Sequence, residues 1–129
     1  MNSNELKIYC VTNKKVNFIS KPEYKLSWVG NEEIPKNYLK CNSGDNIYHK
    51  EKFYSELTFH YWYWKNLLKN ESEKNWVGFC QKRRFWIKSK SIVEEINSKN
   101  LVNHLISEPE EDWNKYESIL CEPIKVYGA

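Results

Sequence analysis

Apolar residues gather in two short runs, and a longer segment with helical spacing separates them. Leu6–Val11 alternates and then becomes wholly apolar, with the β-branched and aromatic residues typical of a buried strand. Trp76–Gln81 is a second run of this kind. Between them, Tyr54–Asn70 has Ser55 or a near neighbour as its expected N-cap and carries apolar residues at i, i+4, i+7 and i+11, namely Leu57, Tyr61, Trp64 and Leu68. This β-α-β order predicts that the two strands are parallel.

The rest of the chain predicts shorter elements. Proline and glycine punctuate residues 13–52, which we interpret as a long irregular connection holding one or two short strands. Ser91–Glu94 and Ser107–Glu110 both have the Ser-x-x-Glu form of a capping box, and each predicts the start of a helix. Ser118–Cys121 predicts another strand. The pattern therefore predicts the α/β class, with a partly parallel sheet flanked by helices.

Length and composition bound the kind of protein. The 129 residues leave room for a single domain. The net charge of +3 is too small and too diffuse to indicate a nucleic-acid partner by itself. No apolar run approaches the roughly 18 residues of a membrane span, and residues 1–7 lack the basic and apolar stretches of a secretory signal. We therefore expect a cytoplasmic protein without a transmembrane segment.

The cysteines and histidines are scattered. Cys10, Cys80 and Cys121 lie in apolar strand-like runs, where a buried thiol acts as a small hydrophobic residue, and Cys41 stands apart from them. No two cysteines have the close spacing of a zinc knuckle, and the three histidines do not cluster in the sequence either. We expect no disulfide and no metal site built from Cys and His.

The two arginines are the first candidates for a binding site. Nearly every other cation is lysine, yet Arg83 and Arg84 are adjacent and directly follow the run that ends near Gln81. The carboxyl ends of strands are where open α/β sheets bind ligands. Because a guanidinium group can make two parallel hydrogen bonds to a phosphate or a carboxylate, we expect the pair to bind such a group, although one of the two can instead be a solvated flank.

Three segments resemble one known family in their order and spacing: Asn42–Ile47, Ser55–Asn66 and Trp76–Trp86. The opening strand, Lys7–Lys14, is similar to the start of that family as well. Over residues 6–87, and more weakly beyond, the chain resembles the N-terminal domain of a family that was first catalogued as a domain of unknown function. That family is found in capsular and exopolysaccharide glycosyltransferases.

The resemblance implies a Rossmann-like sheet corresponding to the N-terminal half of a GT-A fold. Residues 1–129 are then a single, truncated nucleotide-sugar-binding domain, whose partners are a nucleotide-diphosphate sugar donor and a glycan acceptor. The implied donor contacts are Gly44, Asp45, Asn46, Arg83 and Arg84. On the residues alone, a surface turn is the better interpretation of the segment around Gly44, and the resemblance brings the two interpretations near parity.

Other candidates are weaker, and no catalytic residue can be named. Glu56 lies in the first turn of the predicted helix, where a carboxylate is favoured for structural reasons, and Trp62 is a minor candidate for stacking on a sugar. The Asp-x-Asp motif that holds the metal in many GT-A enzymes is absent, since Asp45 and Asp112 are the only aspartates. The cofactor is therefore unknown, and a divalent metal is expected only if its ligands lie beyond Ala129.

Two other functions remain open at this point. A non-catalytic carbohydrate-binding or interaction module would explain the six Trp and nine Tyr residues. A single-stranded nucleic-acid-binding domain would use the basic and aromatic segment Lys82–Lys88. We rank nucleic acid last, because the carboxylates nearly balance the lysines.

Overall fold

The computed structural model describes residues 5–17 and 19–123. Within these ranges the strands, the α-helices and the 3-10 helices (η) follow one another in the order β1 (Leu6–Thr12), β2 (Tyr24–Trp28), η1 (Tyr48–Lys50), α1 (Glu51–Tyr54), α2 (Leu57–Asn66), η2 (Leu68–Asn70), β3 (Trp76–Gln81), η3 (Val93–Glu95), α3 (Leu101–His104) and η4 (Glu111–Lys115).

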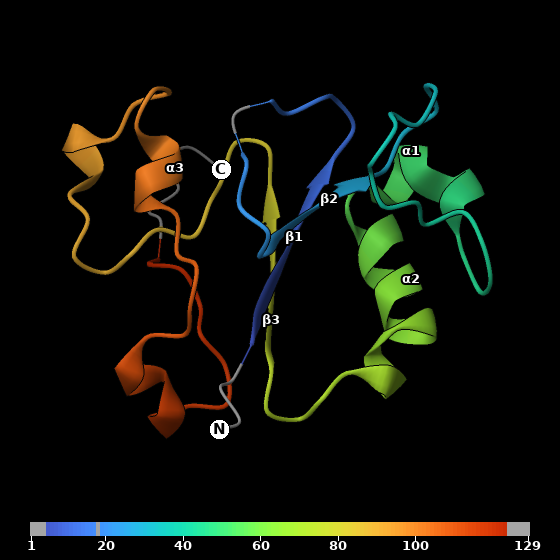
Figure 1. The fold of residues 1–129 in the computed structure, drawn as a ribbon. Coiled ribbons are helices and arrows are strands. Elements are labelled where there is room, and N and C mark those ends of the chain that lie inside the picture. The colour runs from blue at the N-terminus through green and yellow to red at the C-terminus, as the bar shows by residue number, and fades with distance from the viewer. Residues whose placement is uncertain (1–4, 18, 124–129) are drawn as a thin grey trace.

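The strands form one open sheet in the order β2-β1-β3, and both strand pairs are parallel (Figure 1). Cys10 at the centre of β1 pairs with Leu26 of β2 and with Cys80 of β3. The predicted α/β class is confirmed: a parallel sheet is flanked by helices, which is consistent with half of a Rossmann-like fold. The two predicted strand runs are confirmed as β1 and β3, and they are neighbours in the sheet.

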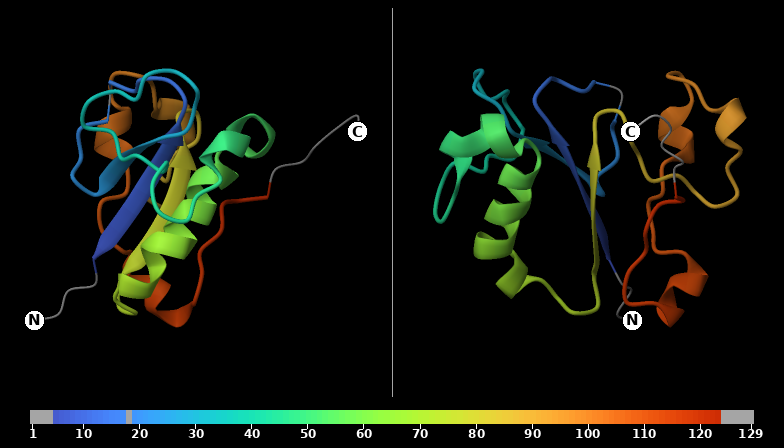
Figure 2. Two further views of the ribbon diagram at one scale, coloured as in Figure 1. Left: turned by 90° about the vertical axis from the view of Figure 1, so that its right-hand side faces the viewer. Right: turned by 180° about the vertical axis from the view of Figure 1, so that it is seen from behind.

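The two faces of the sheet are covered differently. Side chains of β1 alternate between the faces, as the pleat of a strand requires. Tyr9 and Val11 pack with α2, whereas Ile8 and Cys10 pack with the C-terminal third of the chain. Figure 2 shows α2 on one side of the sheet and the segment from η3 to η4 on the other. Two apolar clusters therefore hold the fold together, one on each face.

Helix α2 presents a different face to the sheet from the one its apolar stripe predicts. Leu57 and Trp64 are 54% and 56% exposed, whereas Phe59 and Tyr63 are buried. The ring of Tyr9 lies 5.3 Å from that of Phe59 and 5.2 Å from that of Tyr63, measured between centroids. The predicted stripe was wrong because apolar and aromatic residues occur nearly all round this helix, so periodicity alone does not select a face.

The predicted helix over Tyr54–Asn70 is also not continuous. Ser55 adopts a positive φ of 47° and closes α1, its amide donating to the carbonyl of Glu51 at 2.7 Å. Glu56 then takes the N-cap position of α2, and no side chain caps that helix. Ser55 is therefore a break between two helices, and the N-cap falls on its neighbour Glu56, as the prediction of Ser55 or a near neighbour allowed.

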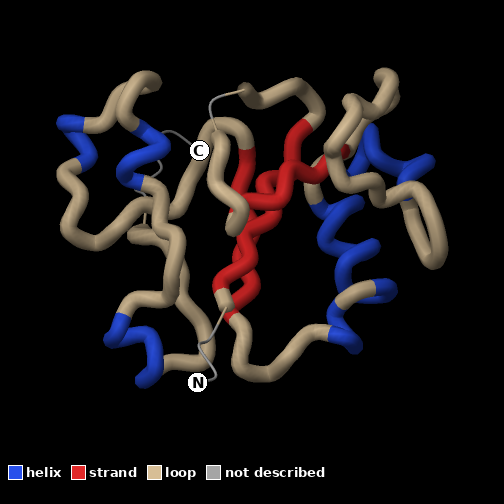
Figure 3. Tube along the Cα trace, viewed as in Figure 1, coloured by secondary structure: helices blue, strands red, loops and turns tan. Residues whose placement is uncertain are grey.

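The C-terminal third is mostly irregular, as Figure 3 shows by its long loops between short helical turns. Ser91 was expected to begin a helix, but its hydroxyl lies 2.9 Å from Nδ1 of His104, and only the single turn η3 follows. The second expected helix does form, as the short 3-10 helix η4 through Trp113, but it begins at Glu111 without a side-chain cap. Glu110 receives hydrogen bonds from the amide and hydroxyl of Ser89, and it precedes the short η4. Ser91 and Glu110, which would form the two capping boxes, are hydrogen-bonded instead to residues distant in the sequence.

The strand expected at Ser118–Cys121 is absent from the described structure, where this segment is extended but pairs with no strand. Cys121 is consequently exposed, which corrects the expectation of a buried thiol, while Cys10, Cys41 and Cys80 are buried. All four cysteines are free thiols.

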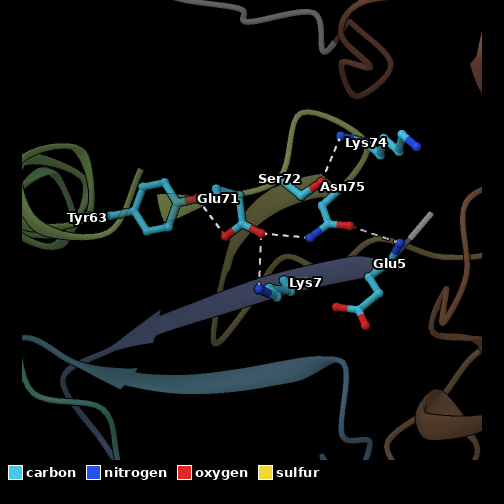
Figure 4. A network of polar contacts seen from close by, with 7 residues as sticks. All are labelled: Glu5, Lys7, Tyr63, Glu71, Ser72, Lys74 and Asn75. Atoms are coloured by element: carbon cyan, nitrogen blue, oxygen red, sulfur yellow. Dashed lines mark hydrogen bonds and ion pairs between the residues drawn. The ribbon is translucent and has the colours of Figure 1, made fainter. Parts of the chain in front are cut away.

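A polar network lies at the amino ends of β1 and β3, which we call the amino edge of the sheet (Figure 4). The carboxylate of Glu71 accepts hydrogen bonds from Lys7 at 3.0 Å, from Asn75 at 2.9 Å and from Tyr63 at 3.3 Å. Asn75 in turn accepts a hydrogen bond from the amide of Glu5. The network joins the start of β1 to the connection between α2 and β3.

Candidate functional site

The carboxyl ends of β1 and β3 form a crevice at the point where the chain changes direction. From β1 the chain leads to β2 on one side, whereas β3 lies on the other side of β1. Open α/β sheets bind ligands at such a switch point. A cavity of about 160 Å³ lies there, lined by Val11, Thr12, Asn13, Val29, Glu51, Ser55, Glu56, Gln81, Lys82 and Arg83. We call it the crevice cavity.

A tight turn explains where the two arginines go. Gln81 and Arg84 exchange backbone hydrogen bonds of 3.1 and 3.2 Å, which leaves Lys82 and Arg83 at the tip of the turn. Arg83 lines the crevice cavity, and Arg84 lines a different cavity beside the outer edge of β3. The structure thus separates two side chains that were expected to act on the same diphosphate.

The cations of the crevice are not neutralised by ion pairs. Lys82 Nζ donates to the neutral Oδ1 of Asn13 at 2.7 Å. In the part of the chain that the structure describes, Lys7–Glu71 at the amino edge is the only ion pair, so no carboxylate oxygen lies within 4.0 Å of the Arg83 guanidinium. Two carboxylates, Glu51 and Glu56, also line the cavity. The crevice therefore offers both cationic groups for phosphate and acidic groups for hydroxyls.

Two more features of the crevice favour a ligand. Glu56 at the N-terminus of α2 lines its wall, and the positive end of a helix dipole favours an anion. Ser55, one of two described non-glycine residues with positive φ, lines the same cavity. Such backbone outliers concentrate at functional sites.

The structure places the segment Gly44–Asn46 away from the crevice, against the middle and C-terminal end of α2. Asn66 donates to the carbonyl of Asp45 at 2.8 Å, and Tyr61 donates to Asp45 Oδ1 at 2.8 Å. Asn46 Nδ2 donates to the carbonyl of Gly44 at 3.0 Å. None of these three candidate residues lines any of the four cavities described for this fold, and their polar atoms hold the loop in shape.

Trp62 is not placed to bind a sugar, whereas Glu56 is placed to contact a ligand. Trp62 is buried and its Nε1 donates to the carbonyl of Ser43 at 2.8 Å, so its ring packs in the core instead of facing a sugar. Glu56, which the sequence assigns a structural role, lies at the crevice and accepts a hydrogen bond from Gln81 Nε2 at 2.9 Å.

The second cavity measures about 440 Å³ and lies between the first half of α2 and the outer edge of β3. We call it the edge cavity. Burial lowers the pKa of His60 in its wall, and the neighbouring carboxylate of Glu56 opposes that shift. Burial therefore favours the neutral imidazole of His60. The cavity is lined by Glu56, Leu57, His60, Phe79, Cys80, Gln81, Arg84, Phe85, Trp86 and Cys121.

Across residues 5–17 and 19–123, no three His, Cys, Asp or Glu side chains lie close enough together to hold a metal ion. Among the helices described, none has the length and apolar character that crossing a bilayer requires.

One family model matches nearly the whole chain. Residues 7–128 match the family described as Domain of unknown function (DUF4422). The chain belongs to this family. No curated protein and no solved structure matches the chain. The DUF4422 domain thus covers nearly the whole sequence. The description of the family assigns no chemistry, so the function is inferred from the residues of the site.

Sequence reasoning missed several residues of the crevice. Asn13, Ser55 and Lys82 follow or precede predicted elements directly, which was a usable signal once the strands were known to be neighbours. Glu51 carried no signal, because it lies in α1, which the break at Ser55 separates from α2.

Proposed function

We propose that this DUF4422 domain binds a nucleotide-diphosphate sugar in the crevice cavity, as the donor-binding part of a glycosyltransferase that acts on a polysaccharide acceptor. The observation that carries the proposal is the position of Arg83, without a carboxylate partner among the described residues, in a cavity at the switch point of a parallel sheet. The three segments that resemble polysaccharide glycosyltransferases support the same reading.

The chemistry of transfer explains why a cation is needed there. The acceptor hydroxyl oxygen forms a bond to the anomeric carbon and gives its proton to a general base, the bond from that carbon to the phosphate oxygen breaks, and its electron pair leaves with the nucleoside diphosphate. Arg83 and Lys82 would neutralise the charge that develops on this leaving group. Glu51 would accept hydrogen bonds from ribose hydroxyls.

This proposal assigns the diphosphate to Arg83 and Lys82, and it leaves Arg84 for another ligand group. Gly44, Asp45 and Asn46 were expected to contact the donor as well. Their hydrogen bonds to α2 and to one another support a structural role for them in this domain.

Calorimetric titration of the 129-residue chain with UDP, GDP and their sugar conjugates, with and without Mn²⁺, tests the proposal. We expect saturable binding of one nucleotide class. Arg83→Ala should raise the Kd about 10- to 100-fold, because a charge-assisted hydrogen bond contributes about 1.5–3 kcal/mol. Thermal unfolding should show a matching loss of ligand-induced stabilisation.

Arg84→Ala is the matched control. It also removes a guanidinium group, but from the neighbouring residue, which lines the other cavity. It should leave the affinity for the bare nucleotide within about twofold of the wild type. If folded wild-type protein binds no nucleotide, or if both variants lose binding equally, the crevice is not a donor site.

A further inference from the structure

The edge cavity has the size and chemistry of a separate binding site. Its volume of about 440 Å³ lies within the roughly 300–1,000 Å³ typical of small-molecule pockets. Aromatic side chains from β3 and from the segment after the turn form its walls, namely Phe79, Phe85 and Trp86. Glu56, His60 and Arg84 add polar groups.

These polar groups suit hydroxyls better than phosphates. Arg84 is the only side chain among the lining residues that carries a fixed positive charge, and Glu56 is an acceptor with its Oε2 bound to no other described group. A neutral imidazole on His60 can both donate and accept. Hydroxyl groups on a ring need donors and acceptors of this mixed kind, and the apolar faces of a sugar pack on aromatic rings.

The edge cavity and the crevice cavity share a wall. Glu56 and Gln81 line both cavities, and the hydrogen bond of 2.9 Å between them forms part of the boundary. A ligand group in one cavity therefore lies next to a ligand group in the other. This is the arrangement that group transfer from a phosphate to a sugar requires.

We propose that the edge cavity is a saccharide subsite, in which a pyranose ring packs against Phe79 and Trp86 while Glu56 and Arg84 bind its hydroxyls. The inference rests on the proposed function in one respect: the ring is either the sugar of the donor or the end of the glycan acceptor. Both sources share the same chemistry, and the experiment separates them.

Saturation-transfer NMR on the 129-residue chain, with the methyl glycosides of glucose, galactose and their N-acetylamino counterparts, measures saccharide binding directly. The same samples are then titrated with UDP. We expect one glycoside to show saturable transfer, and Arg84→Ala to weaken it at least about tenfold. Arg83→Ala should leave glycoside binding unchanged.

A second pair of variants tests the location without touching the charged groups. Leu57→Arg places a long side chain at the mouth of the edge cavity, where Leu57 is 54% exposed, and should abolish glycoside binding. Leu68→Arg is the control, because Leu68 is 48% exposed and lines none of the four cavities. It should bind the glycoside as the wild type does.

Stronger retention of the glycoside in the presence of UDP would assign the acceptor, because two ligands then occupy the two cavities together. Competition between the glycoside and a nucleotide sugar, but not UDP, would assign the sugar of the donor. Either result supports the subsite.

The two proposals fail separately. UDP binding that depends on Arg83, with no glycoside bound, would overturn the saccharide subsite and leave the donor site standing. Glycoside binding that depends on Arg84, with no nucleotide bound, would keep the subsite and overturn the donor site in favour of a carbohydrate-binding module. Glycoside binding that survives both Arg84→Ala and Leu57→Arg would also overturn the subsite.

Discussion

The two ends of the sheet differ in how their charged groups are partnered. At the amino edge, Glu71 receives three hydrogen bonds and pairs with Lys7. At the carboxyl edge, Lys82 contacts only a neutral amide, and Arg83 has no carboxylate within 4.0 Å in the described structure. The same strands thus end in a satisfied network on one side and, among the described residues, in cations without an ion pair on the other.

This difference separates stability from binding. Paired and hydrogen-bonded charges stabilise the fold, and removing one partner leaves the other unsatisfied. Unpaired cations on a crevice stabilise little but remain available for a ligand. Substitutions at the amino edge should therefore affect unfolding, and substitutions at the carboxyl edge should affect binding.

The largest effect on stability should come from Glu71→Ala. It removes the acceptor of Lys7, Asn75 and Tyr63 in a single step. We expect a loss of about 2 kcal/mol in the free energy of unfolding, since each hydrogen bond to a charged group contributes about 1.5–3 kcal/mol and solvent replaces part of it. Urea denaturation followed by circular dichroism measures this loss. A change below about 0.5 kcal/mol, the size expected for a plain surface substitution, would contradict the role of the network.

Acid should remove the same stabilisation gradually. Burial of Glu71 acts to raise its pKa, but hydrogen bonds from Asn75 and Lys7 outweigh it, so the pKa is below its ordinary value of 4.5. A group with a lowered pKa in the folded state contributes stability above its unfolded pKa and loses it as the pH falls through the folded value. The stability gap between wild type and Glu71→Gln should therefore be constant near neutral pH and shrink below about pH 4.5. A gap that is independent of pH down to acid unfolding would rule this out.

Gly44→Ala should have an intermediate effect and should separate the loop from the binding site. Gly44 has a φ of +64°, and a methyl group there would overlap Oδ1 of Asn66. We expect a loss of about 1–2 kcal/mol, the cost of a left-handed conformation for alanine. Ser43→Ala is the control and should change stability by less than about 0.5 kcal/mol, because the Ser43 side chain is exposed and makes no hydrogen bond to the described residues.

The binding measurement completes this test of the loop. Asp45→Asn should leave the nucleotide Kd unchanged, because Asp45 faces Tyr61 and lines none of the four cavities. A large loss of nucleotide affinity in this variant would return the loop to the donor site.

The smallest effect on stability should come from the two arginines. Arg83→Ala and Arg84→Ala remove exposed side chains that have no ion pair in the described structure, and each should change the free energy of unfolding by less than about 0.5 kcal/mol. The same urea titrations measure it. A loss as large as that of Glu71→Ala would contradict this difference between the two ends of the sheet. It would mean that Arg83 or Arg84 stabilises the fold.

Local patterns predicted the elements whose environment is simple. β1 and β3 are apolar on both faces because both faces are covered, and such runs are readily recognised. The helix between them was also predicted, but not its break at Ser55 or its buried face, since rings occur on nearly all its sides. Neither predicted capping box forms, because Ser91 and Glu110 bind partners far along the chain, although a short helical turn follows each of them.

For the site, the sequence indicated that the two arginines matter but not that they serve different cavities. That division depends on the turn closed by the backbone hydrogen bonds between Gln81 and Arg84, which is local. It also depends on the distant residues that line each cavity, which are not local. Glu56 likewise read as a helix-terminal carboxylate until its contact with Gln81 placed it between the cavities.

The sequence by itself determined the α/β class, the parallel pairing of the two apolar strands and the cationic end of the second one. These follow from hydrophobic periodicity and chain order, which are local properties. The tertiary structure alone decided which helix face is buried and which side chains share a cavity. Those outcomes depend on contacts between residues far apart in the chain, such as Asn13 with Lys82 and Glu56 with Gln81, and no local pattern encodes them.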